Sequence, residues 1–183
     1  MAEQRVVVVS KEILPETAKK VTDMFTRLAG SPIPAKYEAH HLHSDLIRSL
    51  LKVQHIHRGR ITCILTVKPY ACFQVLNAET LNKRIGHNAY NTLHGGAVGA
   101  VAEMVATACA RTVVDKDKDL FLGELSVSYL AAAPKQTEVI IDASVVRSGR
   151  NLTIVAIEFK LKNSERSTSL CRATFYNMPV ASL

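Results

Sequence analysis

His94-Gly95-Gly96 opens a long apolar run, AVGAVAEMVATACA at residues 97–110. A run of this length and apolarity, opening on two glycines, predicts a largely buried helix over residues 95–114. One acid, Glu103, interrupts the run. A lone carboxylate among apolar neighbours is costly unless it is paired or used, so Glu103 is a candidate general base. An interface salt bridge and a helix edge that reaches water are the alternatives.

The sequence on both sides of this helix alternates with the period of β-strands. Upstream, residues 61–67 predict a strand, with a hairpin partner at 50–57 and a turn at Arg58-Gly59. Downstream, four alternating runs follow, at 125–129, 139–145, 153–161 and 169–175. Strands so close in sequence pair antiparallel, and one antiparallel sheet can bury one face against a single helix. We therefore predict an α+β fold.

Residues 1–39 predict an N-terminal helical extension, and residues 40–183 a single domain. Val21, Met24, Phe25 and Leu28 have the spacing of an amphipathic helix that begins near Pro15. A second, short helix is predicted near residues 42–50. Residues 69–91 read as a long loop, a feature that is often functional in compact domains.

Composition limits the classes of partner. The 183 residues carry a formal net charge of +7, which attracts polyanions of several kinds. Only 5% of the residues are aromatic, Trp is absent, and no nucleic-acid-binding signature is present, so nucleic acid is not the expected partner.

Neither a metal nor a cofactor is predicted. The four cysteines lack zinc or redox spacing, and the histidines near residues 40–57 lack recognised partners. No apolar run reaches the ~20 residues of a membrane span. We expect a cytoplasmic protein. A peroxisome or another organelle is the alternative, since Ala181-Ser182-Leu183 is loosely similar to a peroxisomal address.

The two glycines lie where the long helix should begin. A helix N-terminus offers unpaired N–H groups and a partial positive charge, and glycine allows an oxygen atom to approach them closely. The junction could therefore bind the oxygen of a carbonyl group. A tight turn with close backbone packing is the alternative.

Gly95 and Glu103 are eight residues apart, which is ~12 Å along one helix. They cannot both touch one carbonyl carbon. If both act, the acid must meet the glycine turn of a second chain, with the two helices antiparallel about a two-fold axis. Joint action thus predicts an obligate dimer.

The pattern Asn88-x-x-x-Thr92-Leu93-His94-Gly95-Gly96, with an acid nine residues after the histidine, resembles the PaaI-like hotdog-fold acyl-CoA thioesterases. The acyl-CoA thioesterase 13 type looks closest. The resemblance covers residues 40–178, including Ser128-Tyr129-Leu130 and Ser148-Gly149-Arg150. It implies a hotdog fold and hydrolysis of a fatty or aryl acyl-CoA to free acid and coenzyme A. It also implies a homodimer or a dimer of dimers.

The resemblance also implies roles for individual residues. Gly95 matches the glycine whose N–H polarises the thioester carbonyl. Glu103 matches the acid that acts as general base or as nucleophile. Asn88 matches the residue that holds the water or the thioester, and His94 matches the histidine that orders the turn.

Further positions match parts of the substrate site. Gly96 belongs to the same turn as the carbonyl-binding glycine. Arg147, Gly149 and Arg150 lie where relatives often contact the phosphates of coenzyme A. Surface arginines at a hairpin are otherwise usually only solvated.

The sequence departs from the family pattern at several points. Asn91 stands where close relatives have Gly, and residues 69–86 look like an insertion. Leu122 stands where a Ser or Thr often orients the water; Glu124 and Ser126 are expected to share its strand face. These departures keep two rival functions open: a catalytically weak acyl-CoA-binding protein, and a hydratase or dehydratase on the same fold.

Overall fold

A computed structural model describes residues 8–26, 50–67 and 92–179, with nine helices and strands among them. In chain order these are β1 (Val8–Val9), α1 (Pro15–Thr26), β2 (Leu51–His57), β3 (Arg60–Thr66), α3 (Gly95–Arg111), β4 (Lys118–Tyr129), β5 (Glu138–Ser148), β6 (Leu152–Leu161) and β7 (Ser167–Pro179).

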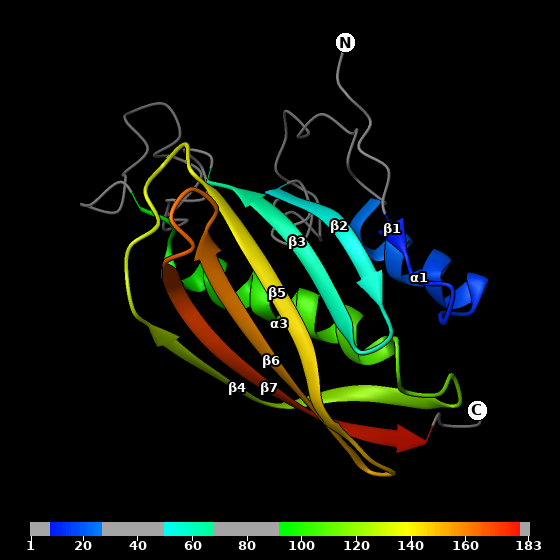
Figure 1. The fold of residues 1–183 in the computed structure, drawn as a ribbon. Helices are drawn as coiled ribbons and strands as arrows, with labels where there is room; N and C mark the ends of the chain where they lie inside the picture. The colour runs from blue at the N-terminus through cyan, green and yellow to red at the C-terminus, as the bar shows by residue number, and fades with distance from the viewer. Residues whose placement is uncertain (1–7, 27–49, 68–91, 180–183) are drawn as a thin grey trace, which may run out of the picture.

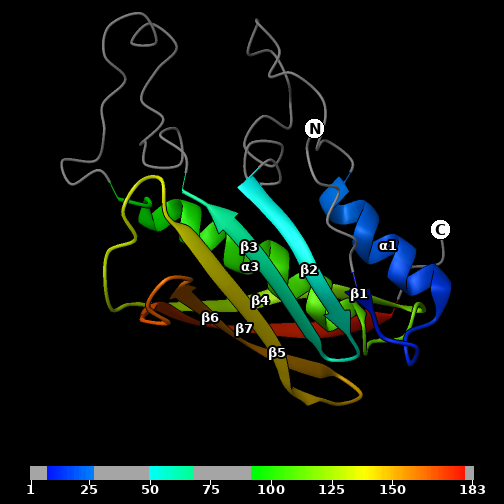
Figure 2. The same cartoon turned by 45° about the horizontal axis from the view of Figure 1, so that its top comes forward.

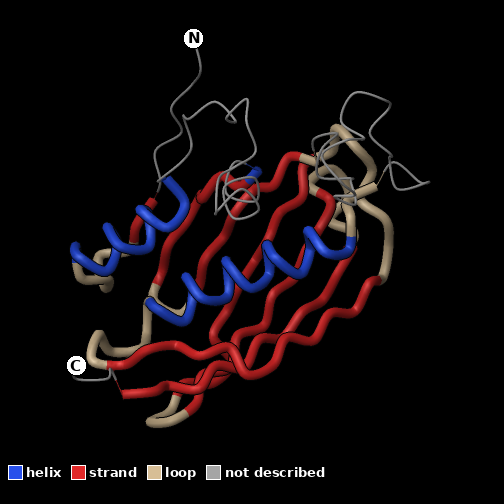
Figure 3. Tube along the Cα trace, turned by 180° about the vertical axis from the view of Figure 1, so that it is seen from behind, coloured by secondary structure: helices blue, strands red, loops and turns tan. Residues whose placement is uncertain are grey.

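The strands form one sheet in the order β1-β2-β3-β5-β6-β7-β4. Every neighbouring pair is antiparallel except β1 and β2. The sheet curves around α3, which crosses its concave side (Figures 1 and 2). Seen from behind in Figure 3, the helix lies open to view over the strands. The predicted α+β fold, the β2–β3 hairpin and the four later strands are confirmed.

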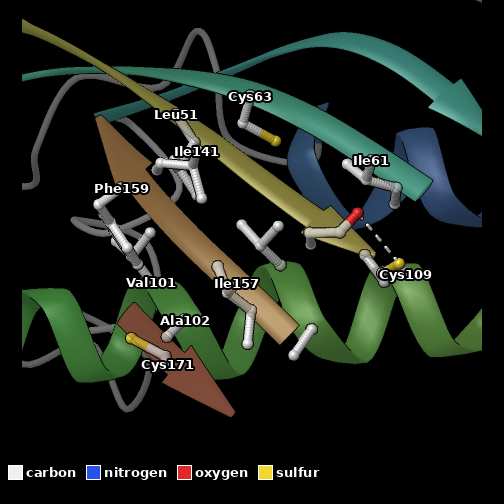
Figure 4. Close-up of a cluster of buried hydrophobic side chains, with 14 of the residues drawn as sticks. Leu51, Ile61, Cys63, Val101, Ala102, Cys109, Ile141, Ile157, Phe159 and Cys171 are labelled. Atoms are coloured by element: carbon white, nitrogen blue, oxygen red, sulfur yellow. Dashed lines mark hydrogen bonds between the residues drawn. The ribbon is translucent and has the colours of Figure 1, made fainter. Parts of the chain in front are cut away.

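One side of α3 forms the core with the sheet. We call this side the inner face; its buried residues are Val98, Val101, Ala102, Val105, Ala106, Ala108, Cys109 and Ala110. Many of them are alanines, which allow the sheet to approach the helix axis closely. Figure 4 shows Ile141, Ile157 and Phe159 of the sheet above this face. The helix ends at Arg111 rather than at the predicted 114, with Thr112 as its C-cap.

Three free cysteines are buried in this core. Burial raises the pKa of the Cys109 thiol to about 12 and that of Cys171 to about 11, and it raises the pKa of Cys63 as well. A thiol must ionise to react, so these side chains act as small apolar groups.

The N-terminal segment packs on the same core. The predicted helix is present as α1, and its Val21 is fully buried in one cluster with residues of the sheet and of α3. The two-residue strand β1, which is too short to show alternation, pairs parallel with His55 and Ile56. The predicted boundary at residue 39, the helix near 42–50 and the loop 69–91 lie outside the described residues.

Candidate active site

His94, Gly95 and Gly96 form the entrance of α3, called the helix entrance below. His94 is the N-cap, with extended backbone angles, and its Nδ1 accepts a hydrogen bond from the Gly96 N–H at 3.0 Å. The carbonyl of His94 accepts the N–H of Val98 at 3.1 Å. This is the geometry that a turn-ordering histidine requires.

The helix entrance is anchored to the connection between β4 and β5. The N–H of Leu93 donates to the carbonyl of Ala133 at 2.8 Å, and Thr92 forms an isolated bridge with Pro134. The hydroxyl of Tyr129, at the end of β4, donates to the carbonyl of Gly95 at 2.9 Å. Sequence spacing gives no sign of this contact, because Tyr129 and Gly95 are 34 residues apart.

Neighbouring side chains leave little room for a Cβ at Gly95 or Gly96. A Cβ on Gly95 would lie 3.1 Å from the hydroxyl oxygen of Tyr129, and a Cβ on Gly96 would lie 3.1 Å from Nδ1 of His94. Both distances are tighter than ordinary side-chain contact. Among the described residues, the Gly95 N–H has no acceptor. The entrance therefore holds a free donor at the positive end of a helix.

The structure corrects the expectation that Glu103 is buried among apolar neighbours. Glu103 is exposed in the single chain, and it forms no ion pair with a described residue. Its sequence neighbours Ala102 and Val105 point to the sheet, because successive helical residues turn by about 100°. The carboxylate can be desolvated only if something else covers this side of α3.

This second side of α3 is called the outer face. It consists of residues spaced by three or four: Gly96, Gly99, Ala100, Glu103, Thr107 and Arg111. Small side chains predominate on it, so the backbone is accessible over two turns. Thr107 follows Glu103 by one turn, and its hydroxyl donates to the Glu103 carbonyl at 2.8 Å. The spacing of four residues places Thr107 and Glu103 on the same face of the helix.

Glu124 and Ser126 do not share the face of Leu122, contrary to expectation. The register against β7 shifts between Leu122 and Glu124, which marks a bulge at Gly123. Leu122 packs against the core, while Glu124 lies on the opposite side of the sheet and pairs with Arg172 at 3.3 Å. One extra residue reverses the alternation. Neither side chain can replace a hydroxyl at Leu122.

The ring of Tyr176 explains why the bulge residue is a glycine. A Cβ on Gly123 would clash with a ring carbon of Tyr176. Glycine at 123 thus allows the ring of Tyr176 on β7 to cross the strand.

Arg147, Gly149 and Arg150 lie together, exposed, at the hairpin between β5 and β6. The side chain of Asn177 donates to the carbonyl of Gly149, and Lys118 donates to the carbonyl of Arg150, each at 2.8 Å. The hairpin is therefore a fixed surface that carries two cations.

This hairpin lies at the far end of α3 from the helix entrance (Figure 1). The link runs through Gly59, whose N–H donates to Oγ1 of the C-cap Thr112 and whose carbonyl accepts the N–H of Val145 on β5. The 17 residues of α3 separate the two ends by ~25 Å. One chain therefore does not bring the arginines and Gly95 together.

Asn88, the remaining predicted site residue, lies outside the described residues. Within the part of the chain that the structure describes, no group of His, Cys, Asp and Glu side chains could hold a metal ion. Nor does any helix in these segments have the length and apolarity to cross a membrane.

Comparison with known sequences finds a matching family model and a similar protein. Residues 90–168 match the family model of the thioesterase superfamily, a segment that runs from the helix entrance through β6. A Caenorhabditis elegans protein named as an esterase is 29% identical over 115 residues, which is 63% of this chain. The chain spans 64% of the length of that relative.

Two solved structures show the same fold. The zebrafish thioesterase superfamily member 2 superimposes with a TM-score of 0.64 at 19% identity, over 87% of this chain and 96% of its own. A hypothetical thioesterase of Streptococcus pneumoniae, solved with coenzyme A, gives 0.58 at 14% identity, over 72% and 88%. The predicted thioesterase resemblance and the hotdog fold are confirmed.

Proposed function

We propose that this hotdog-fold chain, whose residues 90–168 carry the thioesterase superfamily match, is an acyl-CoA thioesterase. It would hydrolyse a fatty or aryl acyl-CoA to the free acid and coenzyme A. The observation that carries the proposal is the arrangement on α3. The N–H of Gly95 at the helix entrance has no acceptor among the described residues, and two turns further lies an exposed carboxylate.

Gly95 binds the thioester oxygen in the proposed reaction. Its N–H lies at the N-terminus of a 17-residue helix, where aligned peptide dipoles favour negative charge. Charge accumulates on the carbonyl oxygen as the carbon becomes tetrahedral, so this donor stabilises the transition state more than the substrate. Gly96 presents no side chain that could block the approach.

Glu103 activates the attacking group. As general base, it takes a proton from water while the water oxygen attacks the carbonyl carbon. The tetrahedral intermediate then breaks its C–S bond, and the proton passes from Glu103 to the departing sulfur of coenzyme A. As nucleophile, the same carboxylate attacks the carbonyl carbon and releases the thiolate, and water cleaves the resulting anhydride.

The proposal requires two chains. Glu103 and Gly95 of one α3 are ~12 Å apart, so each acid serves the helix entrance of the other chain. In an antiparallel pair that sets Glu103 opposite Gly95, the helices cross at Gly99, midway between them. Gly99 fits a close crossing, because a Cβ built there meets nothing within 4 Å. β4 also has a neighbour on only one side among the described strands, so its other edge can pair with the partner's strand.

The same pairing of chains gives a role to Arg147 and Arg150 at the hairpin between β5 and β6. An antiparallel partner brings the C-terminal end of one α3 toward the helix entrance of the other. Arg147 and Arg150 of one chain would then meet the phosphates of coenzyme A whose thioester lies at the other chain's Gly95. We propose a homodimer as the catalytic unit and a dimer of dimers as the complete assembly. Asn88 would hold the water or thioester beside the helix entrance.

The proposal has three further parts. The absence of a hydroxyl at Leu122 favours a catalytically weak acyl-CoA-binding protein as the second candidate function. Buried free thiols suit a reducing compartment such as the cytoplasm. Residues 1–39 would form the N-terminal extension.

A thiol-release assay tests the proposed function. The substrates are acyl-CoA esters from acetyl to long-chain, together with aryl esters, each with Glu103→Gln and Glu103→Ala beside the unmodified chain. We expect release with at least one ester and its loss in both variants. Release that both variants retain would refute the role of Glu103. Binding without release from any ester would identify the binding protein.

A further inference from the structure

The peptide unit between Gly95 and Gly96 is held at both of its polar atoms. Its carbonyl oxygen accepts the hydroxyl of Tyr129 at 2.9 Å. Its N–H donates to Nδ1 of His94 at 3.0 Å. Because a peptide unit is planar, two hydrogen bonds on opposite edges fix the orientation of the whole plane.

Fixing the plane of this peptide unit also restricts the preceding peptide unit, between His94 and Gly95. The preceding peptide carries the Gly95 N–H, and its carbonyl, on His94, accepts the N–H of Val98 at 3.1 Å. Glycine has more backbone freedom than any other residue, so two adjacent glycines would otherwise let the entrance adopt several conformations. The bonds from Tyr129 and His94 restrict that freedom and set the direction of the Gly95 N–H.

Tyr129 is well placed to impose this constraint. It is the last residue of β4, its backbone is paired with Ser169 of β7, and the next N–H, of Leu130, donates to Thr168 at 2.9 Å. Its ring lies against Gly95, with ring atoms at 3.2 and 3.4 Å from the position of a Cβ. Yet the side chain is 60% exposed, so packing in the core does not account for it. A sheet edge thus orients a helix entrance.

We propose that Tyr129 is a positioning residue: its hydroxyl holds the Gly95–Gly96 peptide so that the Gly95 N–H is aimed at the thioester oxygen. The inference rests on the proposed function, because the oxygen belongs to the proposed substrate. Positioning acts through Gly95 and affects the transition state, where the N–H bond is strongest.

An isotope experiment reads the contact directly. The chain has eight glycines, and only Gly95 and Gly96 are adjacent. Labelling every glycine with carbonyl ¹³C and amide ¹⁵N therefore gives one carbonyl–amide correlation in an HNCO spectrum, and it belongs to this peptide. Tyr129→Phe keeps the ring and removes the hydroxyl, so we expect the carbonyl shift of this peak to move. An unmoved peak would overturn the contact and the proposal with it.

Kinetics distinguish positioning from simple structural support. Tyr129→Phe should lower kcat about tenfold, with KM within about twofold and an unchanged Tm. Tyr176→Phe is the matched control, since the hydroxyl of Tyr176 on the adjacent β7 has no hydrogen bond to a described residue. The control should leave kcat, KM and the HNCO peak unchanged. A peak that moves in Tyr129→Phe without loss of kcat, or with a lowered Tm alone, would overturn positioning.

A ketone analogue of the substrate, with CH₂ in place of the thioester sulfur, separates the inference from the proposed function. If the chain binds the analogue but hydrolyses no thioester, the proposed function fails, and positioning of a carbonyl is still tested. Weaker binding in Tyr129→Phe than in Tyr176→Phe would then support the inference, and equal binding would overturn it. If the chain neither binds nor hydrolyses, both proposals fall.

Discussion

The two faces of α3 both carry small residues, but they have opposite surroundings. On the inner face, Val101 and Val105 are fully buried against the sheet. On the outer face, Gly96 and Glu103 are exposed in the single chain. Both faces are rich in small residues. On the inner face the small residues let the sheet approach, and on the outer face they leave the helix backbone accessible.

The difference separates stability from activity on one helix. The inner face is completed by the chain's own strands, so its side chains determine whether the chain folds. The outer face is completed, in our proposal, only by a second copy, so its side chains determine whether the folded chain reacts. Changes on the two faces should therefore have different consequences, and the predictions below test that separation.

The largest effect is expected from the acid of the outer face. Glu103→Gln should lower kcat by about 10³-fold, because an amide can neither take a proton from water nor attack the carbonyl. The free energy of unfolding should change by less than about 0.5 kcal/mol, because the side chain is exposed. Steady-state kinetics and denaturant unfolding measure the two quantities on one preparation.

A mixing experiment asks whether the acid acts on the partner. Gly95→Val removes the other half of the site, since its Cβ would press on Tyr129. Equal amounts of Glu103→Gln and Gly95→Val chains are mixed and allowed to exchange subunits. Half of the dimers are then mixed, and each mixed dimer has one intact site of two. About a quarter of the activity of the unmodified dimer should therefore return. Mixed dimers detected by mass spectrometry without any activity would place both groups in one chain.

A smaller loss, about 100-fold in kcat, is expected when the outer face is blocked at Gly99. Gly99→Phe should be tolerated in the single chain, where a Cβ meets nothing within 4 Å. The bulky ring should hold two helices apart and misplace each Glu103. Gly99→Ala is the matched control and should stay dimeric and active. Light scattering gives the oligomeric state, and a fully active Gly99→Phe dimer would show that the helices do not cross there.

The elements with local periodicity were predictable from the sequence. The spacing of apolar residues within a few positions predicts the long helix, the β2–β3 hairpin and the four later strands. Tyr129 could not be found in this way. Its partner Gly95 is 34 residues away, and only the folded sheet brings the two together.

Two expectations, for Glu103 and for Glu124, are wrong for physical reasons that can be read in part from the sequence. Glu103 looked buried because its sequence neighbours were counted without regard to their direction around the helix. Glu124 was assigned to the face of Leu122 because alternation was assumed to continue through Gly123. A glycine inside a strand is a known sign of a bulge, and here the ring of Tyr176 leaves no room for a side chain at residue 123.

A change on the inner face should lower the free energy of unfolding, by roughly 2 kcal/mol, and leave the activity unchanged. Val105→Ala removes two methyl groups from a fully buried position and leaves a cavity beside the sheet. Denaturant unfolding should report this loss at constant m-value, while kcat and KM measured well below Tm stay unchanged. A drop in kcat without a loss of stability would mean that the inner face also orients Glu103.

The smallest effect, about tenfold in kcat, is expected at Thr107 on the outer face. Leu122 packs against the core and offers no hydroxyl, whereas Thr107 carries one a single turn beyond Glu103. Its hydroxyl donates to the Glu103 carbonyl at 2.8 Å, so it fixes the turn that bears the acid and still has lone pairs to receive a water proton. Thr107→Val keeps the shape and loses both functions, while Thr107→Ser keeps them and should remain within about threefold of the unmodified chain. Equal kcat values for Val and Ser at this position would show that Glu103 works without a hydroxyl from its own helix.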